Sequence, residues 1–210
     1  LILILLQSNS LKISLTDMVN NFFSRSYIEY IPFLFPAVFA VLPPTFYDSL
    51  VYSLGLPNFI LQNHGFVHAP QFMFFNMFIY YEILMIPAVF MGDFVPRIFH
   101  FLVGCVFILS LLDFASIKFG LKKNILLFII LSLPLTLFLL TTVKADLIAT
   151  LFVFLGIKKY LRKQIVKSAI FWGFAVGIKV IYLIPLFVFM LWSIIHSKKI
   201  NLKQNTTTIF

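Results

Sequence analysis

A small set of charged side chains interrupts the apolar part of this chain and could do chemistry. Three are carboxylates, Asp48, Glu82 and Asp146, and two are lysines within long apolar runs, Lys144 and Lys179. A carboxylate can take a proton from an attacking group or help to bind a divalent cation, and a lysine offers a point charge to a phosphate. Charged residues in apolar segments are functional candidates by default. These five residues therefore predict a site rather than a solvated surface.

The composition indicates that lipid surrounds most of the chain. Of the 210 residues, 61% are hydrophobic and 11% are charged, and the mean hydropathy is +1.04. An ordinary soluble domain is about 45 to 50% apolar, with roughly 25% charged residues. A water-soluble fold of this length could not hide so much apolar surface. We therefore expect one all-α, polytopic transmembrane domain over residues 1 to 210.

The net charge of +9 fits membrane topology better than nucleic-acid binding. Eleven of the 16 Lys and Arg residues form three short clusters beside apolar runs, at positions 118 to 123, 158 to 167 and 198 to 203. Cytoplasmic loops collect Lys and Arg, and anionic headgroups attract them. No other feature supports a nucleic-acid partner, so we expect membrane lipids around the chain and no nucleic acid.

Two stretches, residues 122 to 163 and 163 to 203, share one plan. Each has basic residues at both ends and a lysine between two apolar runs, Lys144 in the first and Lys179 in the second. Basic ends favour the cytoplasm. Each stretch is therefore predicted to be a hairpin whose central lysine reaches the opposite surface.

The first half of the chain is predicted to hold two spans with an external loop between them. The spans cover residues 28 to 44, where Pro43-Pro44 ends the helix, and 97 to 117. The loop between them covers residues 45 to 96.

This loop is expected to combine an irregular connection with a helix that lies on the membrane surface. Residues 45 to 71 are polar and aromatic, with Pro57 as a helix breaker. Residues 72 to 92 are apolar enough for a helix, but Glu82 at the bilayer centre would cost about 2.5 kcal/mol or more. Tyrosine and phenylalanine suit the headgroup region, and a crossing here would place Asp48 on the face of the basic clusters. We therefore predict an interfacial helix over 72 to 92.

With this topology the external face gathers charges of both signs. A mixed set of this kind indicates a site, because solubility needs no such pattern. Its members are Asp48, Glu82, Asp93, Asp146, Arg97, Lys144 and Lys179.

A series of short motifs resembles the N-terminal half of bacterial GT-C membrane glycosyltransferases, relatives of the protein mannosyltransferases and the lipid A aminoarabinose transferase. The resemblance covers roughly residues 28 to 195, in order and with spacing that suits the family. Its first part, which is similar to the family's first external loop, is Pro43-Pro44-Thr45-Phe46-Tyr47-Asp48-Ser49-Leu50-Val51-Tyr52, followed by Leu56-Pro57. The later parts are Tyr81-Glu82-Ile83-Leu84, Gly92-Asp93, Phe99-His100-Phe101, Thr141-Thr142-Val143-Lys144-Ala145-Asp146-Leu147 and Gly177-Ile178-Lys179.

The resemblance implies an inverting sugar transfer from a polyprenyl-phosphate-linked donor to a lipid or glycan acceptor. It implies an integral protein of the bacterial inner membrane with its site on the extracytoplasmic face. In such enzymes the first-loop aspartate is the expected acid/base residue, which corresponds to Asp48. The leaving group is a lipid phosphate, and Lys144 and Lys179 are the lysines expected to bind it. The supporting residues are Tyr47, Glu82 and Asp146.

The chain also departs from the family pattern. Asp48 is followed by Ser49 where several relatives carry a second acid, so another carboxylate must serve or none is needed. Glu82 and Asp146 could orient Lys144, hold the acceptor or bind a divalent cation, although no metal-spacing motif is present. Complete members are much longer, so we expect this chain to be one part of an enzyme, which could be inactive alone.

Each candidate residue has a plainer alternative role. Asp48 could cap the helix that follows it. Lys144 and Asp146 could pair with each other at a loop. Lys179 could simply extend to the membrane surface.

Two other classes of protein compete with the transferase. A transporter or flippase of lipid-linked substrates would also place charges in a membrane bundle, along the substrate path. Against it, the charges are predicted at helix ends and no inverted repeat is evident. A structural assembly subunit would explain the hydrophobicity but not the ordered motifs.

Overall fold

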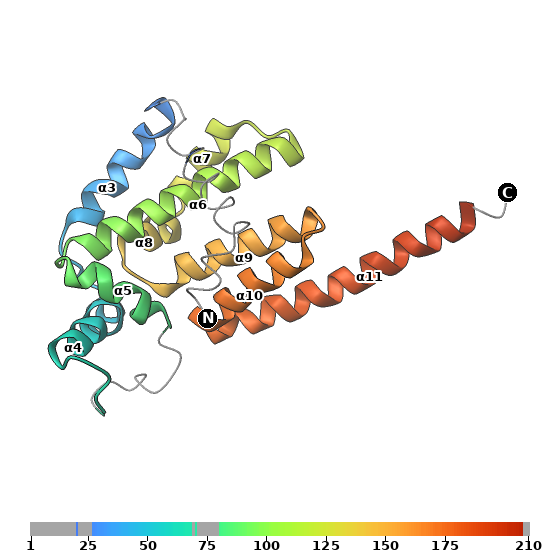
Figure 1. Ribbon diagram of the computed structural model, residues 1–210. Coiled ribbons are helices and arrows are strands. Elements are labelled where there is room, and N and C mark those ends of the chain that lie inside the picture. Colours follow the sequence, from blue (N-terminus) through green and yellow to red (C-terminus); the bar gives the residue numbers. More distant parts are fainter. Residues whose placement is uncertain (1–19, 21–26, 69, 71–79, 208–210) are drawn as a thin grey trace.

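The computed structural model describes residues 20, 27–68, 70 and 80–207, and every regular element in this part of the chain is a helix. Figure 1 shows a group of helices from which α11 extends away. The predicted all-α class is therefore confirmed for the described residues. Of the predicted interfacial helix over 72 to 92, residues 72 to 79 lie outside them.

The predicted span over 28 to 44 is a shorter, interrupted helix. Pro32 cannot donate a backbone hydrogen bond, which favours an interruption in its turn. The end of the helix is as predicted, because Leu42 precedes a proline and is extended, with ψ of 149°. The elements are η1 (Tyr27–Glu29), η2 (Ile31–Phe33) and α3 (Leu34–Val41).

The described part of the connection over 45 to 71 is helical over most of its length, so the irregular connection predicted there is wrong for residues 49 to 62. It contains the π-helix η3 (Ser49–Gly55) and α4 (Leu56–Gln62). Pro57 lies in the first turn of α4, where a missing N–H is tolerated, so it does not break the helix. Gly65 lies just beyond the end of α4, and its N–H donates to the Ile60 carbonyl at 3.0 Å.

The described part of the segment predicted over 72 to 92 is helical, and the span predicted over 97 to 117 is confirmed as a helix. The described part of the 72 to 92 segment forms α5 (Tyr80–Phe90), and the span expected over 97 to 117 is α6 (Val95–Phe119). Gly120, with φ of +67°, ends α6 in the left-handed conformation that glycine adopts readily. Arg97 joins α6 to α3, because its Nη1 donates to the Val41 carbonyl at 2.7 Å.

The first arm of the 122 to 163 hairpin is broken into α7 (Lys123–Ser132) and α8 (Pro134–Thr141). The two helices are bent by 79° to each other. Leu133, between them, has ψ of 119° because the following proline disfavours the helical conformation. The hairpin prediction did not include this bend, although Pro134 gives it a visible cause in the sequence.

The rest of the chain forms α9 (Ala145–Leu161), α10 (Ile165–Ile178), η4 (Val180–Tyr182) and α11 (Leu183–Thr207). Helices α9 and α10 lie side by side (Figure 1). Gly156 permits this approach, since a Cβ there would lie 2.9 Å from the ring of Trp172. The Ser168 hydroxyl also donates to the Gly156 carbonyl at 2.8 Å.

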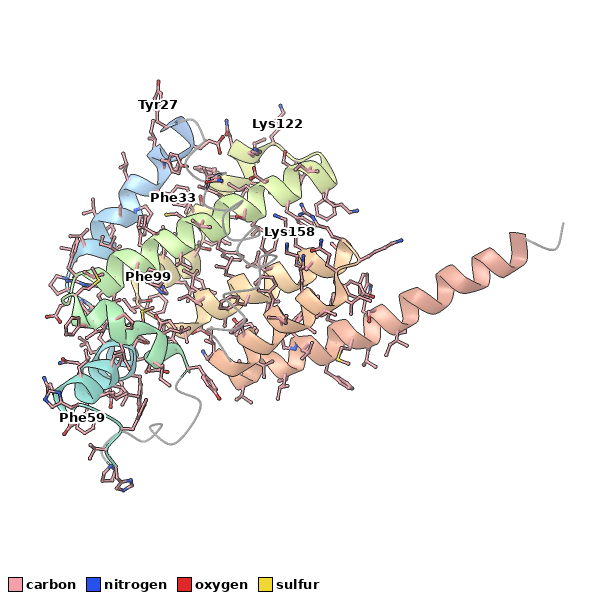
Figure 2. The ribbon with its side chains drawn as sticks, viewed as in Figure 1. Tyr27, Phe33, Phe59, Phe99, Lys122 and Lys158 are labelled. Atoms are coloured by element: carbon pink, nitrogen blue, oxygen red, sulfur yellow. The ribbon has the colours of Figure 1, made fainter. Side chains whose placement is uncertain are left out.

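The clustered basic residues and the two central lysines lie at opposite ends of helices α9 and α10. Lys144 directly precedes α9 and Lys179 directly follows α10. The opposite ends of these two helices carry basic residues such as Lys158 and Lys167. Phe99 lies near the beginning of α6, and in Figure 2 Lys122 and Lys158 lie away from it. The central lysines therefore lie at breaks between helices, as predicted.

By length and composition, one described helix could cross a membrane. This helix is α6, and the bent pair α7 and α8 would add a second if it counts as one span. The other apolar stretches that the structure describes are shorter, for example α5 and α10.

Candidate functional site

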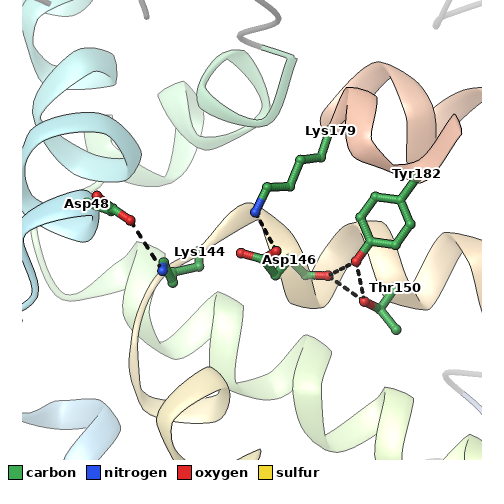
Figure 3. A network of polar contacts seen from close by, with 6 residues as sticks. All are labelled: Asp48, Lys144, Asp146, Thr150, Lys179 and Tyr182. Carbon is green, nitrogen blue, oxygen red and sulfur yellow. Dashed lines mark hydrogen bonds and ion pairs between the residues drawn. The ribbon is translucent and has the colours of Figure 1, made fainter. Parts of the chain in front are cut away.

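Two ion pairs bring four of the predicted site residues into one region (Figure 3). Lys144 Nζ lies 3.3 Å from Asp48 Oδ2, and Lys179 Nζ lies 2.5 Å from Asp146 Oδ1. Lys144 and Asp146 are two positions apart where α8 leads into α9. The segment between these helices therefore holds one member of each pair.

Asp48 is positioned by the helix that it begins. It has helical backbone angles at the start of η3, and it makes no side-chain capping hydrogen bond. The next residue, Ser49, is fully buried and donates its hydroxyl to the Val143 carbonyl at 3.0 Å. Because Val143 is the neighbour of Lys144, this buried bond fixes the two paired residues beside each other.

The π-helix that follows Asp48 depends on a glycine. A Cβ at Gly55 would lie 2.5 Å from the Leu50 carbonyl oxygen, which no side chain could accept without a backbone shift. π-helical turns are rare and often occur at functional sites. Glycine at position 55 therefore permits the π-helical backbone that begins next to Asp48.

Lys144 lies against two aromatic rings. Its Nζ is 4.1 Å from the centroid of Phe46 and 5.4 Å from that of Phe138. The rings contact each other edge to face at 5.0 Å. A cation above a ring is attracted to its negative face. The ammonium is thus held in place, and its side chain is only 18% exposed.

The second pair is joined to the first turn of α9. The Asp146 carbonyl accepts hydrogen bonds from the Thr150 hydroxyl at 2.8 Å and from the Tyr182 hydroxyl at 3.2 Å. These two hydroxyl oxygens lie 2.6 Å apart. Since Tyr182 follows Lys179 by three residues, this network fixes the chain on both sides of the ion pair (Figure 3).

An apolar cluster packs together the elements that carry the charged residues. It joins α5, the start of α9 and the end of α10 through Tyr81, Met85, Val143, Ile148, Ala149 and Ile178. The Tyr81 hydroxyl lies 3.4 Å from His100 Nδ1, and His100 Nε2 is 2.9 Å from the Leu139 carbonyl. Both side chains are almost fully buried. This polar contact ties α5 to α6 and α8 within an apolar region.

Glu82 and Tyr47 are not joined to the ion pairs. In the described part of the chain, neither forms an ion pair or hydrogen bond with those four residues, and Tyr47 is exposed beside the ring of Tyr52. Glu82 Oε2 is buried without a hydrogen-bond partner, and burial raises the pKa of Glu82 to about 7. Burial, together with the charges of Glu82 and Asp146, also holds the pKa of Tyr81 well above its usual range.

The pairing decides between the predicted alternatives. Asp48 does not cap its helix but pairs with Lys144, and Lys144 does not pair with Asp146. Lys179 contacts a carboxylate rather than only extending to a surface. No group of three His, Cys, Asp or Glu residues among those described could hold a metal ion. The divalent cation stays a prediction.

Several residues of the site escaped the sequence analysis. Phe46 and Phe138 carry no signal in a chain with 28 phenylalanines. The i, i+4 spacing of Asp146 and Thr150 on a helix could have indicated their contact. Tyr182 had no local signal, because its partners come from another helix.

Comparison of the chain with protein-family models, with curated proteins and with solved structures finds no match. Function is therefore inferred from what the site can do. A half-exposed carboxylate can accept a proton, and two lysines near it can attract an anion.

Proposed function

We propose that the chain is the N-terminal part of a GT-C-like membrane glycosyltransferase, which transfers a sugar from a polyprenyl-phosphate-linked donor on the extracytoplasmic face. The observation that carries the proposal is the meeting of Asp48 with Lys144, beside Lys179 and Asp146, at one end of the helices. This is the end opposite the clustered basic residues. The acceptor is a lipid or glycan with a free hydroxyl.

The exposed apolar surface supports a membrane setting. Leu34 and Phe35 on α3, Phe128 on α7 and Phe187 on α11 are each more than half exposed. Large apolar side chains exposed on several helices are typical of a surface that contacts lipid or protein. With Lys and Arg gathered at one end, the positive-inside rule orients that end to the cytoplasm and the ion pairs to the outside.

In the proposed reaction, the acceptor oxygen attacks the anomeric carbon and Asp48 takes the hydroxyl proton. The bond between the anomeric carbon and the phosphate oxygen breaks, and its electron pair leaves with the polyprenyl phosphate. Asp48 is suited to this because its side chain is 49% exposed and reachable. Lys144 and Lys179 stabilise the negative charge that grows on the leaving phosphate.

The test is transfer by Asp48→Asn in the full-length protein reconstituted into vesicles. Radiolabelled decaprenyl-phosphate sugars serve as donors and extracted membranes as acceptors, and the measurement is label that leaves the donor. We expect loss of transfer by about a hundredfold or more, because a proton acceptor contributes about that much.

The matched control is Asp93→Asn, an exposed acid at the same end of the molecule. Arg97 bonds to the Asp93 carbonyl and not to its side chain, so this contact remains. Transfer at a normal rate by Asp48→Asn, with both variants inserted equally, would remove Asp48 from the proposed role.

The bend between α7 and α8 favours a second candidate, a transporter or flippase of lipid-linked substrates. Interrupted helices often form substrate sites in transporters, and this pair is bent by 79°. The two functions differ in their product. A transporter moves the donor intact across the vesicle membrane, whereas a transferase releases free polyprenyl phosphate.

A further inference from the structure

The two ion pairs of the site differ in geometry. The Lys179 to Asp146 contact is short, at 2.5 Å, whereas Lys144 and Asp48 are 3.3 Å apart. Charge-assisted hydrogen bonds are typically about 2.7 to 2.9 Å long. The Lys144 pair is therefore the looser of the two.

The exposure of its two partners is also unequal. The Lys144 side chain is 18% exposed and the Asp48 side chain is 49% exposed. The lysine is held by the rings of Phe46 and Phe138, while no capping bond holds the Asp48 carboxylate. The cation is thus the fixed partner, and the carboxylate is the one that can leave.

We propose that the lipid phosphate displaces the Asp48 carboxylate from Lys144. This rests on the proposed function for the identity of the anion. The lysine is a compact charge with three N–H donors on one atom. A phosphate that approaches it carries the same sign as Asp48, so the two anions compete for the lysine.

The exchange orders the reaction. Before the donor binds, Asp48 is engaged with Lys144 and is a poor partner for an acceptor hydroxyl. Once the phosphate occupies Lys144, the carboxylate is free to take the acceptor's proton. The donor therefore binds first, and the base becomes available only when a sugar is in place.

Competition has a signature that is independent of turnover. Asp48→Asn should bind decaprenyl phosphate about two- to fivefold more tightly than the wild type, since it removes a competing exposed ion pair. Lys144→Gln should bind it about tenfold or more weakly, since it removes a charged hydrogen-bond donor. In the double variant, Asp48→Asn should have no further effect.

The experiment is calorimetric titration of the full-length protein in lipid nanodiscs with decaprenyl phosphate, and with decaprenol as the uncharged probe. Asp93→Asn is the matched control, because it removes a negative charge from the same end without contacting Lys144. Its affinity should stay at the wild-type value. Thermal unfolding of each variant checks that the fold is kept.

Three results would overturn the exchange. The first is unchanged or weaker binding by Asp48→Asn, which would leave the proposed function standing. The second is tighter binding of decaprenyl phosphate that persists when Asp48→Asn is combined with Lys144→Gln, or that also occurs with Asp93→Asn. Either result would mean that the loss of a negative charge anywhere at this end of the molecule strengthens binding, without competition for Lys144. The third is wild-type binding of decaprenyl phosphate no tighter than of decaprenol, which together with absent transfer would refute the proposed function as well.

Discussion

At the residue scale, uncharged side chains decide what the charged ones can do. Phe46 and Phe138 hold the ammonium of Lys144, and Tyr182 holds the backbone of Asp146. These contacts leave the Asp48 carboxylate as the least constrained charged group of the pair. The same logic makes the buried carboxyl of Glu82 unusual, because it has no such support at Oε2.

Glu82 gives a pH dependence whose sign follows from its pKa. Burial raises the pKa from 4.5 to about 7, so the folded chain binds this proton more tightly than the unfolded chain does. The contribution to the free energy of unfolding is full below pH 4.5, falls as the pH rises to about 7 and is constant above. The total loss is about 3 kcal/mol, because a shift of one pKa unit corresponds to about 1.4 kcal/mol.

Replacement of Glu82 by glutamine should remove this part of the pH dependence. The measurement is denaturant unfolding of the wild type and Glu82→Gln between pH 4 and pH 8, with Asp93→Asn as an exposed control of the same charge change. Identical profiles for the wild type and Glu82→Gln would show that the carboxyl is solvated in the folded chain.

The choice of charged residues could be made from the sequence, but their pairing could not. Charge is rare in this chain, so Asp48, Lys144, Asp146 and Lys179 stood out. Proximity along the chain suggested Lys144 with Asp146. The observed partners instead come from separate elements, and only the packing of η3 and α10 against the start of α9 brings them together.

At the element scale, the π-helix η3 is the feature with the sharpest requirement. Gly55→Ala should destabilise the protein by about 1 to 3 kcal/mol, because the added Cβ meets the Leu50 carbonyl oxygen at 2.5 Å. Gly173→Ala, in α10, is the matched control, since nothing lies within 4 Å of its Cβ position. We expect the control to be neutral or more stable by up to about 1 kcal/mol.

Thermal unfolding of the two alanine variants measures the difference, and transfer activity shows whether Asp48 keeps its position. Equal stability of Gly55→Ala and Gly173→Ala would mean that the backbone at residues 49 to 55 relaxes without penalty.

Helices with a regular apolar pattern were predictable, and those shaped by contacts were not. α6 lies within two residues of its predicted bounds at each end. The bend at Leu133 could have been inferred from Pro134, since proline disfavours a helical residue before it. η3 has no comparable signal, because a glycine at position 55 does not by itself indicate a π-helix and the buried partner of Ser49, the Val143 carbonyl, is 94 residues away.

At the scale of the whole molecule, the separation of charge between the two ends predicts a topology. In a Cys105→Ser background, which removes the lone cysteine, Asp93→Cys should react with a membrane-impermeant thiol reagent on intact bacterial cells. Arg162→Cys, at the turn between α9 and α10, should react only after lysis. Both residues are exposed, so accessibility within the protein does not differ between them.

Labelling of Arg162→Cys on intact cells, or protection of Asp93→Cys, would reverse the orientation and place Asp48 and Lys144 in the cytoplasm. Lys179→Cys adds a test of depth. A transferase site at the outer surface predicts labelling as fast as that of Asp93→Cys, and a transporter site within the bilayer predicts much slower labelling.

The hydrophobic composition is the basis for predicting a membrane protein, but composition does not predict the lengths of the helices. Among the described residues, α6 is the one unbroken helix that is both long enough and apolar enough to span a membrane. Prolines such as Pro32 and Pro134 divide other apolar runs into shorter helices. An apolar run in the sequence therefore limits where a span can lie without showing that a straight helix fills it.

The hydrogen bond from Arg97 to the Val41 carbonyl has a consequence for how this protein could vary. The bond joins the end of α3 to the beginning of α6, so the two ends of the segment that connects these helices are held together. Lengthening a loop with fixed ends adds little entropic penalty, about 0.6 kcal/mol for each doubling. A change of length in this segment that leaves η3 and α5 packed against the start of α9 should therefore cost little, because its two ends stay together.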